Sequence, residues 1–350
     1  NNNNHALPLS TTTSSIAVVG PLANDASDQL GPDVPIGYSS SDLTSVVPVL
    51  DGIKAAVPHA TVTYAQGCDA NCTSTSGFGA AVSAAQAAAV TVVVVGEPSA
   101  DSGEASSRSD ISLPGQQTAL VQAIAATGKP YVVVLMNGRP LTLGWVADNA
   151  PGLLEAWYPG TEGGNAVADV LFGDVNPGGK LTVSWAHTAG EEPLYYNHNL
   201  THEPEDRPGF TSRYWDMPSK PLYPFGYGLS YTSFKFGNLR LSRASMKAGE
   251  ASEVEVDVTN TGKATGDAVA QVYIHQRAGS ASRPVRQLKG FKRVTLKAGE
   301  TQTVKFTLGK DELEFWSPQT KVWAVEPGTF DVWAGEDSTA GLHAELVVTE

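Results

Sequence analysis

Residues 90–96 read VTVVVVG, the most hydrophobic stretch of the chain. The run shows no polar alternation, which indicates a strand covered on both faces, as the strands of a parallel sheet are. Its length suits a strand, whereas a membrane span requires roughly 20 apolar residues. We therefore expect a buried strand here and no membrane-spanning segment in the chain.

Further apolar runs alternate with helix-like segments on both sides of this strand. Strand character is seen at 16–19, 131–136 and 153–157, and helix character at 80–89 and 113–127. The second helix has Pro114 near its first turn and Gly128 after its end. This alternation predicts an open α/β sheet flanked by helices, an α/β sandwich, over residues 14–185. Residues 1–13 are expected to be a linker.

The hydrophobic periodicity changes to two from Leu239 onward. Acids alternate with valines over 253–258, and 301–308 and 329–333 show similar alternation. About seven such strands, with no helix-length segment, predict an all-β immunoglobulin or fibronectin type III-like sandwich over 238–350. The aromatic-rich and proline-rich stretch 186–237 is expected to be an ordered connection, because flexible linkers seldom carry so many large rings.

The charge of the chain excludes several partners. A formal net charge of -13 argues against nucleic acid and anionic membrane surfaces and favours a neutral or cationic ligand. Only 17% of the residues are charged, a composition typical of secreted proteins. The first residues, NNNNHALPL, lack the basic and apolar regions of a signal peptide. We expect a secreted or periplasmic protein entered from an upstream segment.

Two cysteines, Cys68 and Cys72, lie in a stretch rich in Gly, Asn and Asp. A small-loop disulfide is the prediction. The alternative, a metal site, requires two further ligands, and His59 is the only histidine nearby. No metal is therefore expected.

Familiar catalytic and cofactor motifs are absent. The first strand continues as IAVVGPLAND without the GxGxxG loop that holds a dinucleotide, and NPGGKL lacks two elements of a P-loop. Neither a GxSxG elbow nor an HExxH helix occurs. We expect no cofactor, and serine-hydrolase and zinc-protease chemistry are unsupported.

A carboxylate-rich loop follows the most apolar strand. It holds Glu97, Asp101, Glu104 and Asp110, at the carboxyl end of a strand, where ligands gather in open parallel sheets. Its position favours a functional site. Composition alone favours the alternative, a solvated acidic loop.

Several long motifs resemble glycoside hydrolase family three, most closely the bacterial periplasmic β-glucosidases. In the first half they are GEASSRSDISLPGQQ (103–117), VLMNGRPL (134–141), WYPGTEGGNAVADVLFGDVNPGGKL (157–181) and PFGYGLSYTSF (224–234). The tail adds VTNTG (258–262), RPVRQLKGF (283–291) and LKAGETQTV (296–304). The resemblance covers nearly the whole chain.

This resemblance implies a division of labour. Such enzymes begin with a barrel that supplies the aspartate nucleophile, and their α/β sandwich contributes a general acid/base glutamate within an EASSR sequence, here Glu104. The chain is then the C-terminal portion of a retaining, exo-acting β-glucosidase, inactive without its barrel partner, that acts on β-glucosides or cello-oligosaccharides. A β-xylosidase of the same family and a noncatalytic carbohydrate-binding or adhesion fragment are the alternatives.

The chemistry of retaining glycosidases fits this assignment. They need a carboxylate nucleophile and a second carboxyl group roughly 5 Å away that protonates the leaving oxygen. Glu104 can be only one of the pair. To hold its proton near neutral pH, it needs a pKa raised by burial or by the charge of the nucleophile.

Three other residues are candidate substrate contacts. Glu97 ends the strand directly and is expected to shape the pocket. Arg108 is expected to anchor the loop, with Asp110 as its partner, although a plain surface salt bridge is an equal alternative. Tyr38 is the only aromatic residue in LGPDVPIGYSS (30–40), where relatives carry a tryptophan that stacks on the aglycone.

The tryptophans of the second half also suggest sugar binding, because flat aromatic rings stack on sugars. The candidates are Trp316, Trp323 and Trp333. Their period-two surroundings favour packing in a core or an interface instead.

Overall fold

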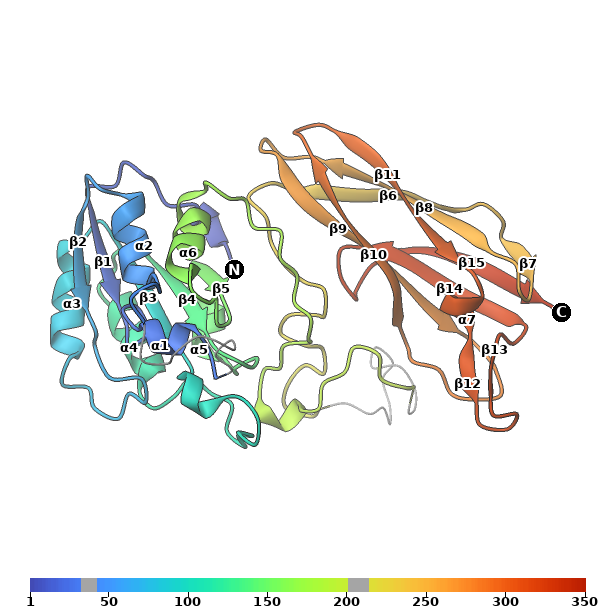
Figure 1. Cartoon of the computed structure of the whole chain (residues 1–350), viewed down its shortest axis with the longest axis horizontal. Helices are drawn as coiled ribbons and strands as arrows, with labels where there is room; N and C mark the ends of the chain where they lie inside the picture. Colours follow the sequence, from blue (N-terminus) through green and yellow to red (C-terminus); the bar gives the residue numbers. More distant parts are fainter. Residues whose placement is uncertain (33–42, 201–213) are drawn as a thin grey trace. The chain divides into compact units, whose positions relative to one another are not determined.

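A computed structural model describes residues 1–32, 43–200 and 214–350 (Figure 1). Within these residues the chain forms two compact units, one of Asn1–Val175 with Ala186–Glu192 and one of Asn176–Trp185 with Pro193–Glu350. The expected boundary at 185 differs from the observed division at Val175. The segment before 185 joins the second unit because Leu181 N donates to Tyr227 O and Trp185 N to Tyr223 O, both at 2.8 Å.

The first unit is a five-stranded parallel sheet in the order β2-β1-β3-β4-β5. Its strands are β1 (Ser15–Val19), β2 (Thr61–Ala65), β3 (Val90–Gly96), β4 (Tyr131–Met136) and β5 (Gly152–Glu155). Its helices are α1 (Ala26–Gln29), α2 (Val49–Ala56), α3 (Phe78–Ala87), α4 (Gln117–Ala125), α5 (Trp145–Asn149) and α6 (Gly163–Phe172). The predicted α/β class is confirmed.

The order of the strands places a topological switch point beside β3. The chain crosses from β1 to β2 in one direction and from β2 through β3 to β5 in the other. Right-handed crossovers that run in opposite directions put their helices on opposite faces of the sheet, and the contacts agree: α3 packs on α4, whereas α2 packs on α6. In such sheets a crevice lies outside the carboxyl ends of the strands at the switch point. The loop after β3 begins at this edge.

The first residues are tied to this unit. Asn3 N donates to Pro151 O and Leu9 N to Leu171 O, both at 2.7 Å. Leu7 is buried as well. The segment predicted to be a linker therefore adds backbone hydrogen bonds and apolar surface to the α/β core.

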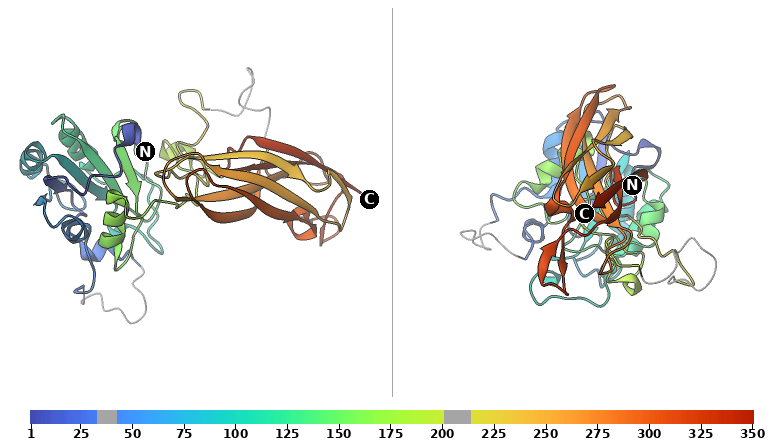
Figure 2. Two further views of the ribbon diagram at one scale, coloured as in Figure 1. Left: turned by 90° about the horizontal axis from the view of Figure 1, so that it is seen from above. Right: turned by 90° about the vertical axis from the view of Figure 1, so that its right-hand side faces the viewer.

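The second unit is a β-sandwich (Figure 2). Its larger sheet has the order β10-β9-β14-β15-β7 and its smaller sheet β11-β8-β6. The strands are β6 (Phe234–Leu241), β7 (Ser245–Lys247), β8 (Ser252–Asn260), β9 (Gly266–Gln276), β10 (Gln287–Leu296), β11 (Thr301–Leu308), β14 (Gly328–Gly335) and β15 (Leu342–Thr349). The core includes the valines of β8, which alternate with acids as the sequence predicts. The fibronectin type III-like class is confirmed.

A two-stranded ribbon lies outside both sheets of the sandwich. It is made of β12 (Phe315–Ser317) and β13 (Val322–Ala324), and the short helix α7 (Lys310–Leu313) precedes it.

Two glycines allow α2 and α6 to pack closely. A Cβ added to Gly52 would lie 2.0 Å from Gly164 O, and one added to Gly164 would lie 2.1 Å from Pro48 O. Both neighbours are backbone atoms, which cannot move aside without shifting a helix. The contact between these helices therefore requires glycine at both positions.

Gly52→Ala should destabilise the first unit by about 2 kcal/mol or more, because the added methyl group separates two packed helices. Gly79→Ala in α3 is the matched control: no atom lies within 4 Å of its added Cβ. It should stabilise the protein by roughly 0.5–1 kcal/mol through helix propensity. Urea unfolding followed by circular dichroism measures both. Equal effects of the two substitutions would contradict the packing argument.

A buried carboxyl group ends β5. Glu155 Oε1 accepts a hydrogen bond from Trp157 N at 2.9 Å, and its Oε2 is out of contact with solvent. Burial raises the pKa of Glu155 to about 8, although hydrogen bonds from Trp157 and Asn137 act in the opposite direction. The folded protein therefore holds a proton on Glu155 that the unfolded chain releases near pH 4.5.

Between pH 4.5 and 8 the native state should bind about one more proton at Glu155 than the unfolded state, so this group makes stability fall as pH rises. Its contribution is about 1.4 kcal/mol per pH unit in that window and is constant above pH 8. Glu155→Gln keeps the acceptor for Trp157 and removes the titration. The variant should therefore lose stability less steeply than the parent in urea titrations between pH 5 and 8. Parallel slopes would show that Glu155 is ionised in the folded protein.

Candidate active site

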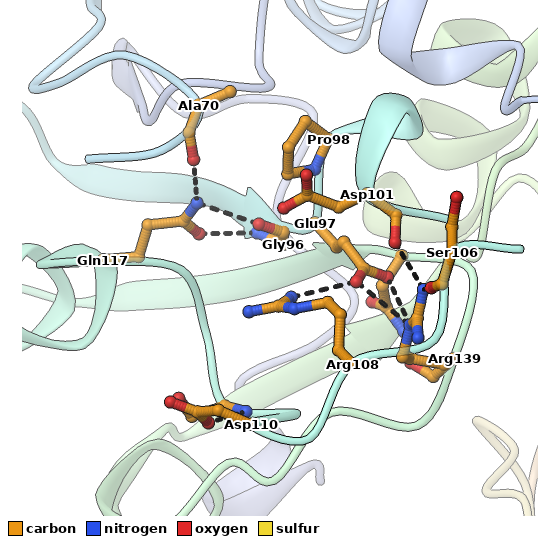
Figure 3. Close-up of polar contacts among 12 residues, drawn as sticks. Ala70, Gly96, Glu97, Pro98, Asp101, Ser106, Arg108, Asp110, Gln117 and Arg139 are labelled. Atoms are coloured by element: carbon orange, nitrogen blue, oxygen red, sulfur yellow. Dashed lines mark hydrogen bonds and ion pairs between the residues drawn. The ribbon is translucent and has the colours of Figure 1, made fainter. Parts of the chain in front are cut away.

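The loop that follows β3 starts from a buried ion cluster. Glu97, the first residue after the strand, is 0% exposed. Arg108 Nη1 donates to its Oε1 at 2.9 Å, and Arg139 Nε donates to its Oε2 at 3.1 Å. Figure 3 shows both guanidinium groups beside this carboxylate. The two cations compensate the cost of burying the Glu97 charge.

Arg108 therefore pairs with Glu97, whereas the sequence favoured Asp110 as its partner. Asp110 is exposed, and its carboxylate accepts a hydrogen bond from Ser112 N at 2.9 Å. Hydrogen bonds from Ser112 lower the pKa of Asp110, with a smaller effect from the charge of Arg108. The buried carboxylate attracts Arg108 because it has no water to stabilise it, while Asp110 is already solvated.

Arg139 links this cluster to the loop itself. Its Nη2 donates to the backbone carbonyls of Asp101 and Ser106, the latter at 2.8 Å. These carbonyls lie on either side of Glu104 in the sequence. One side chain thus holds both ends of the turn that carries the predicted acid/base. Sequence reasoning missed Arg139, although it stands in the VLMNGRPL motif directly after β4.

Glu104 lies at the exposed tip of this turn. Ser106 N donates to Gly103 O at 3.2 Å, and the turn places Gly103 at φ 106° and Ala105 at φ 61°. An alanine at positive φ is uncommon, and such residues persist where the surroundings hold them. The Glu104 carboxylate makes no hydrogen bond or ion pair with any described residue. It is therefore free to meet a group outside this part of the chain.

Further side chains secure the base of the loop. Asp28 Oδ1 accepts hydrogen bonds from Ser99 N at 2.9 Å and Ser99 Oγ at 2.8 Å, and burial raises the pKa of Asp28. Tyr158 Oη donates toward the carbonyls of Glu97 and Pro98, at 3.1 and 3.2 Å, and burial raises the pKa of Tyr158. These supports come from segments distant in the sequence, so the residues around Glu97 did not indicate them.

The loop that contains the two cysteines is linked to the end of β3. Cys68 and Cys72 are joined by a disulfide. The fully buried Gln117 donates from Nε2 to Ala70 O inside this small loop and accepts from Gly96 N at 2.7 Å (Figure 3). The disulfide loop is thereby connected to the last residue of β3.

Tyr38, the predicted aglycone contact, lies outside the described residues.

Among the described residues, one group has the composition of a metal site. The ligand atoms of Asp331, His343 and Glu345 lie within 4.8 Å of one another. Arg277 already forms ion pairs with Asp331, at 2.7 Å, and with Glu345. A guanidinium group thus provides the positive charge there, so the arrangement is a surface ion network.

No helix in the described part of the chain is both long and apolar enough to cross a membrane.

Comparison with known proteins places the chain in a family. The model of the glycosyl hydrolase family 3 C-terminal domain matches residues 1–231, and that of the fibronectin type III-like domain matches residues 268–338. The chain is 45% identical to a β-xylosidase of Formosa agariphila, over 97% of this chain and 46% of that protein. It is also 45% identical to a periplasmic β-glucosidase of Salmonella typhimurium, over 95% of this chain and 46% of that protein.

A solved structure agrees over the full length of the chain. The β-glucosidase of Listeria innocua in complex with glucose matches with a TM-score of 0.91 and 36% identity, over 100% of this chain and 48% of that one. The chain thus spans about half the length of the relatives it matches. It belongs to glycosyl hydrolase family 3, of which it carries the C-terminal α/β domain followed by the fibronectin type III-like domain.

Proposed function

We propose that this chain is the C-terminal portion of a retaining, exo-acting β-glucosidase that hydrolyses terminal non-reducing β-D-glucosyl residues. One observation carries the proposal: Glu104 is exposed and unpaired within the described residues, on a turn that Arg139 holds at both ends. A general acid/base needs this combination, because its backbone must be fixed while its carboxyl group stays available to the substrate.

The nucleophile belongs, in this proposal, to an N-terminal barrel domain. A retaining mechanism requires a second carboxylate roughly 5 Å from the acid. Glu97, the acid at the end of the strand, has its oxygens occupied by Arg108 and Arg139. A carboxylate that two guanidinium groups hold is a weak nucleophile and cannot donate a proton. The proposal therefore assigns the partner carboxylate to another domain.

Glu97 thus takes a positioning role rather than a direct sugar contact, because it is 0% exposed. Arg108 is 22% exposed at its side chain, so a sugar contact through its free nitrogens remains our prediction. A sugar contact by Tyr38 is likewise a prediction.

Export from the cytoplasm is part of the proposal. It rests on the composition, with 17% charged residues, and on the similarity to a relative named as periplasmic.

A β-xylosidase is the second candidate, because one of the two relatives at 45% identity carries that name. Rates of a full-length protein containing this chain on 4-nitrophenyl β-glucoside and β-xyloside distinguish the two. A higher kcat/KM on the xyloside would replace glucose by xylose in the proposal and leave the role of Glu104 unchanged.

The isolated chain should hydrolyse no aryl β-glucoside above background, because an acid without an opposing nucleophile cannot form the glycosyl intermediate. Assays of the purified 350-residue chain, with and without an added barrel domain, test this. Sustained turnover by the isolated chain would show that the nucleophile lies within it. A barrel that restores hydrolysis only when Glu104 is intact would exclude a noncatalytic fragment.

In a full-length protein, Glu104→Ala should reduce kcat/KM strongly, by about 10²-fold or more, for glycosides with poor leaving groups. Activated aryl glycosides should keep a fast first step, since their leaving groups depart unprotonated. Hydrolysis of the glycosyl-enzyme then slows, so a burst of phenol is expected in stopped-flow traces. Azide should restore turnover, because this anion attacks without a general base.

Glu97→Gln is the matched control on the same loop. It leaves two partly buried guanidinium groups without their carboxylate, so we expect a loss of roughly 3 kcal/mol in stability and an equal loss of rate on both classes of glycoside. Azide should not restore this variant. Rescue of Glu97→Gln by azide, together with no rescue of Glu104→Ala, would exchange the two roles.

A further inference from the structure

A pocket of about 420 Å³ opens in the fibronectin type III-like unit, far along the sequence from the acid/base loop. Trp316 and Trp323 line it from the β12–β13 ribbon, and Lys289 lines it from β10. Arg283 and the acids around α7 complete its polar wall. The pocket therefore combines exposed aromatic rings with hydrogen-bonding groups of both signs.

The two tryptophans are exposed to an unusual degree. They face each other across the ribbon, with ring centroids 6.0 Å apart and planes inclined by 68°. Trp316 is 51% exposed and Trp323 is 58% exposed. The sequence favoured core or interface packing, because it shows period two around both residues. In the structure the buried positions of β12 are Phe315 and Ser317, so the alternate position projects Trp316 away from the sandwich.

Trp333, the third candidate of the sequence analysis, is a packed residue by contrast. It lies in β14 of the larger sheet, where the guanidinium of Arg286 covers its ring at 4.4 Å and His343 packs beside it. It offers less open ring surface than the ribbon does.

Lys289 supplies a donor without a partner. The β10–β9 pairing shifts register between Leu288 and Gly290, so Lys289 sits at a β-bulge, a device that re-aims side chains. Burial lowers the pKa of Lys289, while the charges of Glu312 and Glu314 act against this. Among the described residues its ammonium group forms no hydrogen bond and no ion pair. A half-buried donor of this kind favours an external acceptor.

The side chains of Arg283 and Glu312, which also line the pocket, are fixed by contacts within the protein. Arg283 donates from Nε and Nη2 to Gln276 Oε1, at 3.1 and 3.0 Å, and its guanidinium stacks 3.2 Å above the Phe315 ring. Glu312 is held by Gly309 N at 2.8 Å. These fixed polar groups limit the entropy that a ligand would lose by ordering them.

A stabilising cross-strand pair is the simpler explanation of the two tryptophans, since a two-stranded ribbon is marginal by itself. That explanation accounts for the contact between the rings. It does not account for the open ring faces or for the unpaired ammonium of Lys289 in the same pocket. Both features are expected of a binding site for an amphipathic ligand.

We propose that this pocket binds a β-linked oligosaccharide of neutral sugars, which stacks on Trp316 and Trp323 and hydrogen-bonds to Lys289 and the acids near α7. Sugar rings present apolar C–H faces to an indole and hydroxyl groups at their edges, where they both donate and accept. A neutral ligand fits because the wall mixes Lys289 and Arg283 with Asp311, Glu312 and Glu314, so that neither sign of charge is favoured. The chain's net charge of -13 also disfavours acidic polysaccharides.

The proposed site lies in the second compact unit, whereas Glu104 belongs to the first. Its proposed role is to hold a sugar chain. A result that refutes sugar binding would therefore leave the proposed hydrolysis untouched. Binding can therefore be measured on the isolated chain, where no turnover is expected.

Titration calorimetry and tryptophan fluorescence with cellotetraose and xylotetraose test the proposal. We expect saturable binding of at least one probe, with quenched indole emission. Trp316→Ala and Trp323→Ala should each weaken binding by about tenfold or more, because aromatic residues at the centre of a site dominate its affinity. Lys289→Gln should weaken it less, and Glu104→Gln should leave it unchanged.

Phe291→Ala is the matched control. Phe291 is also exposed, at 69%, in β10 of the same unit, but it does not line the pocket. Its removal should not alter binding. Trp316→Phe and Trp323→Phe keep an aromatic face and should retain most of the affinity, which separates stacking from collapse of the ribbon. Thermal unfolding verifies that every variant is folded.

Three results would overturn the proposal: no binding of either tetrasaccharide at millimolar concentration, affinity unchanged in both alanine variants, or an equal loss in Phe291→Ala. Sedimentation velocity tests the competing occupant, a second copy of the chain. Self-association that Trp323→Ala abolishes, without sugar binding, would assign the surface to an interface between copies.

Discussion

The ion cluster at Glu97 is the constraint on which the loop after β3 depends. A carboxylate with no exposure to water must be compensated by opposite charge, and Arg108 and Arg139 provide it. Arg139 then has donors left for the carbonyls of Asp101 and Ser106. The arginine that compensates the buried charge of Glu97 therefore also fixes the backbone on both sides of Glu104.

The position of this cluster follows from the sheet. Parallel strands end at one edge, and the reversal of winding beside β3 leaves that edge uncovered by a crossover connection. Gly96 closes the strand at φ 149°, where a Cβ would lie 1.8 Å from Met136 O. The close approach of β3 and β4 brings Glu97 and Arg139 together. The chemistry of the loop is therefore a consequence of how tightly two neighbouring strands are packed.

The two units offer different kinds of site. In the first, the carboxyl group of Glu104 has no partner among the described residues and lies on a turn that Arg139 holds at both ends, which suits proton transfer to a substrate. In the second, open indole faces and an unpaired ammonium group surround a pocket, which suits retention of a sugar chain.

Local patterns in the sequence determined the elements: the apolar run at 90–96, the alternation of acids and valines at 253–258, and the EASSR motif that contains Glu104. These are properties of neighbouring residues, so periodicity and spacing reveal them. The edge strand β2 escaped notice because its side chains are mostly exposed or half-buried. The pairing of Glu97 with Arg139, 42 residues apart, and the exposure of Trp316 were decided only by the tertiary structure. Strand order decides which side chains meet, and the placement of the β12–β13 ribbon outside the sandwich decides which aromatic rings stay exposed. Neither can be deduced from local sequence.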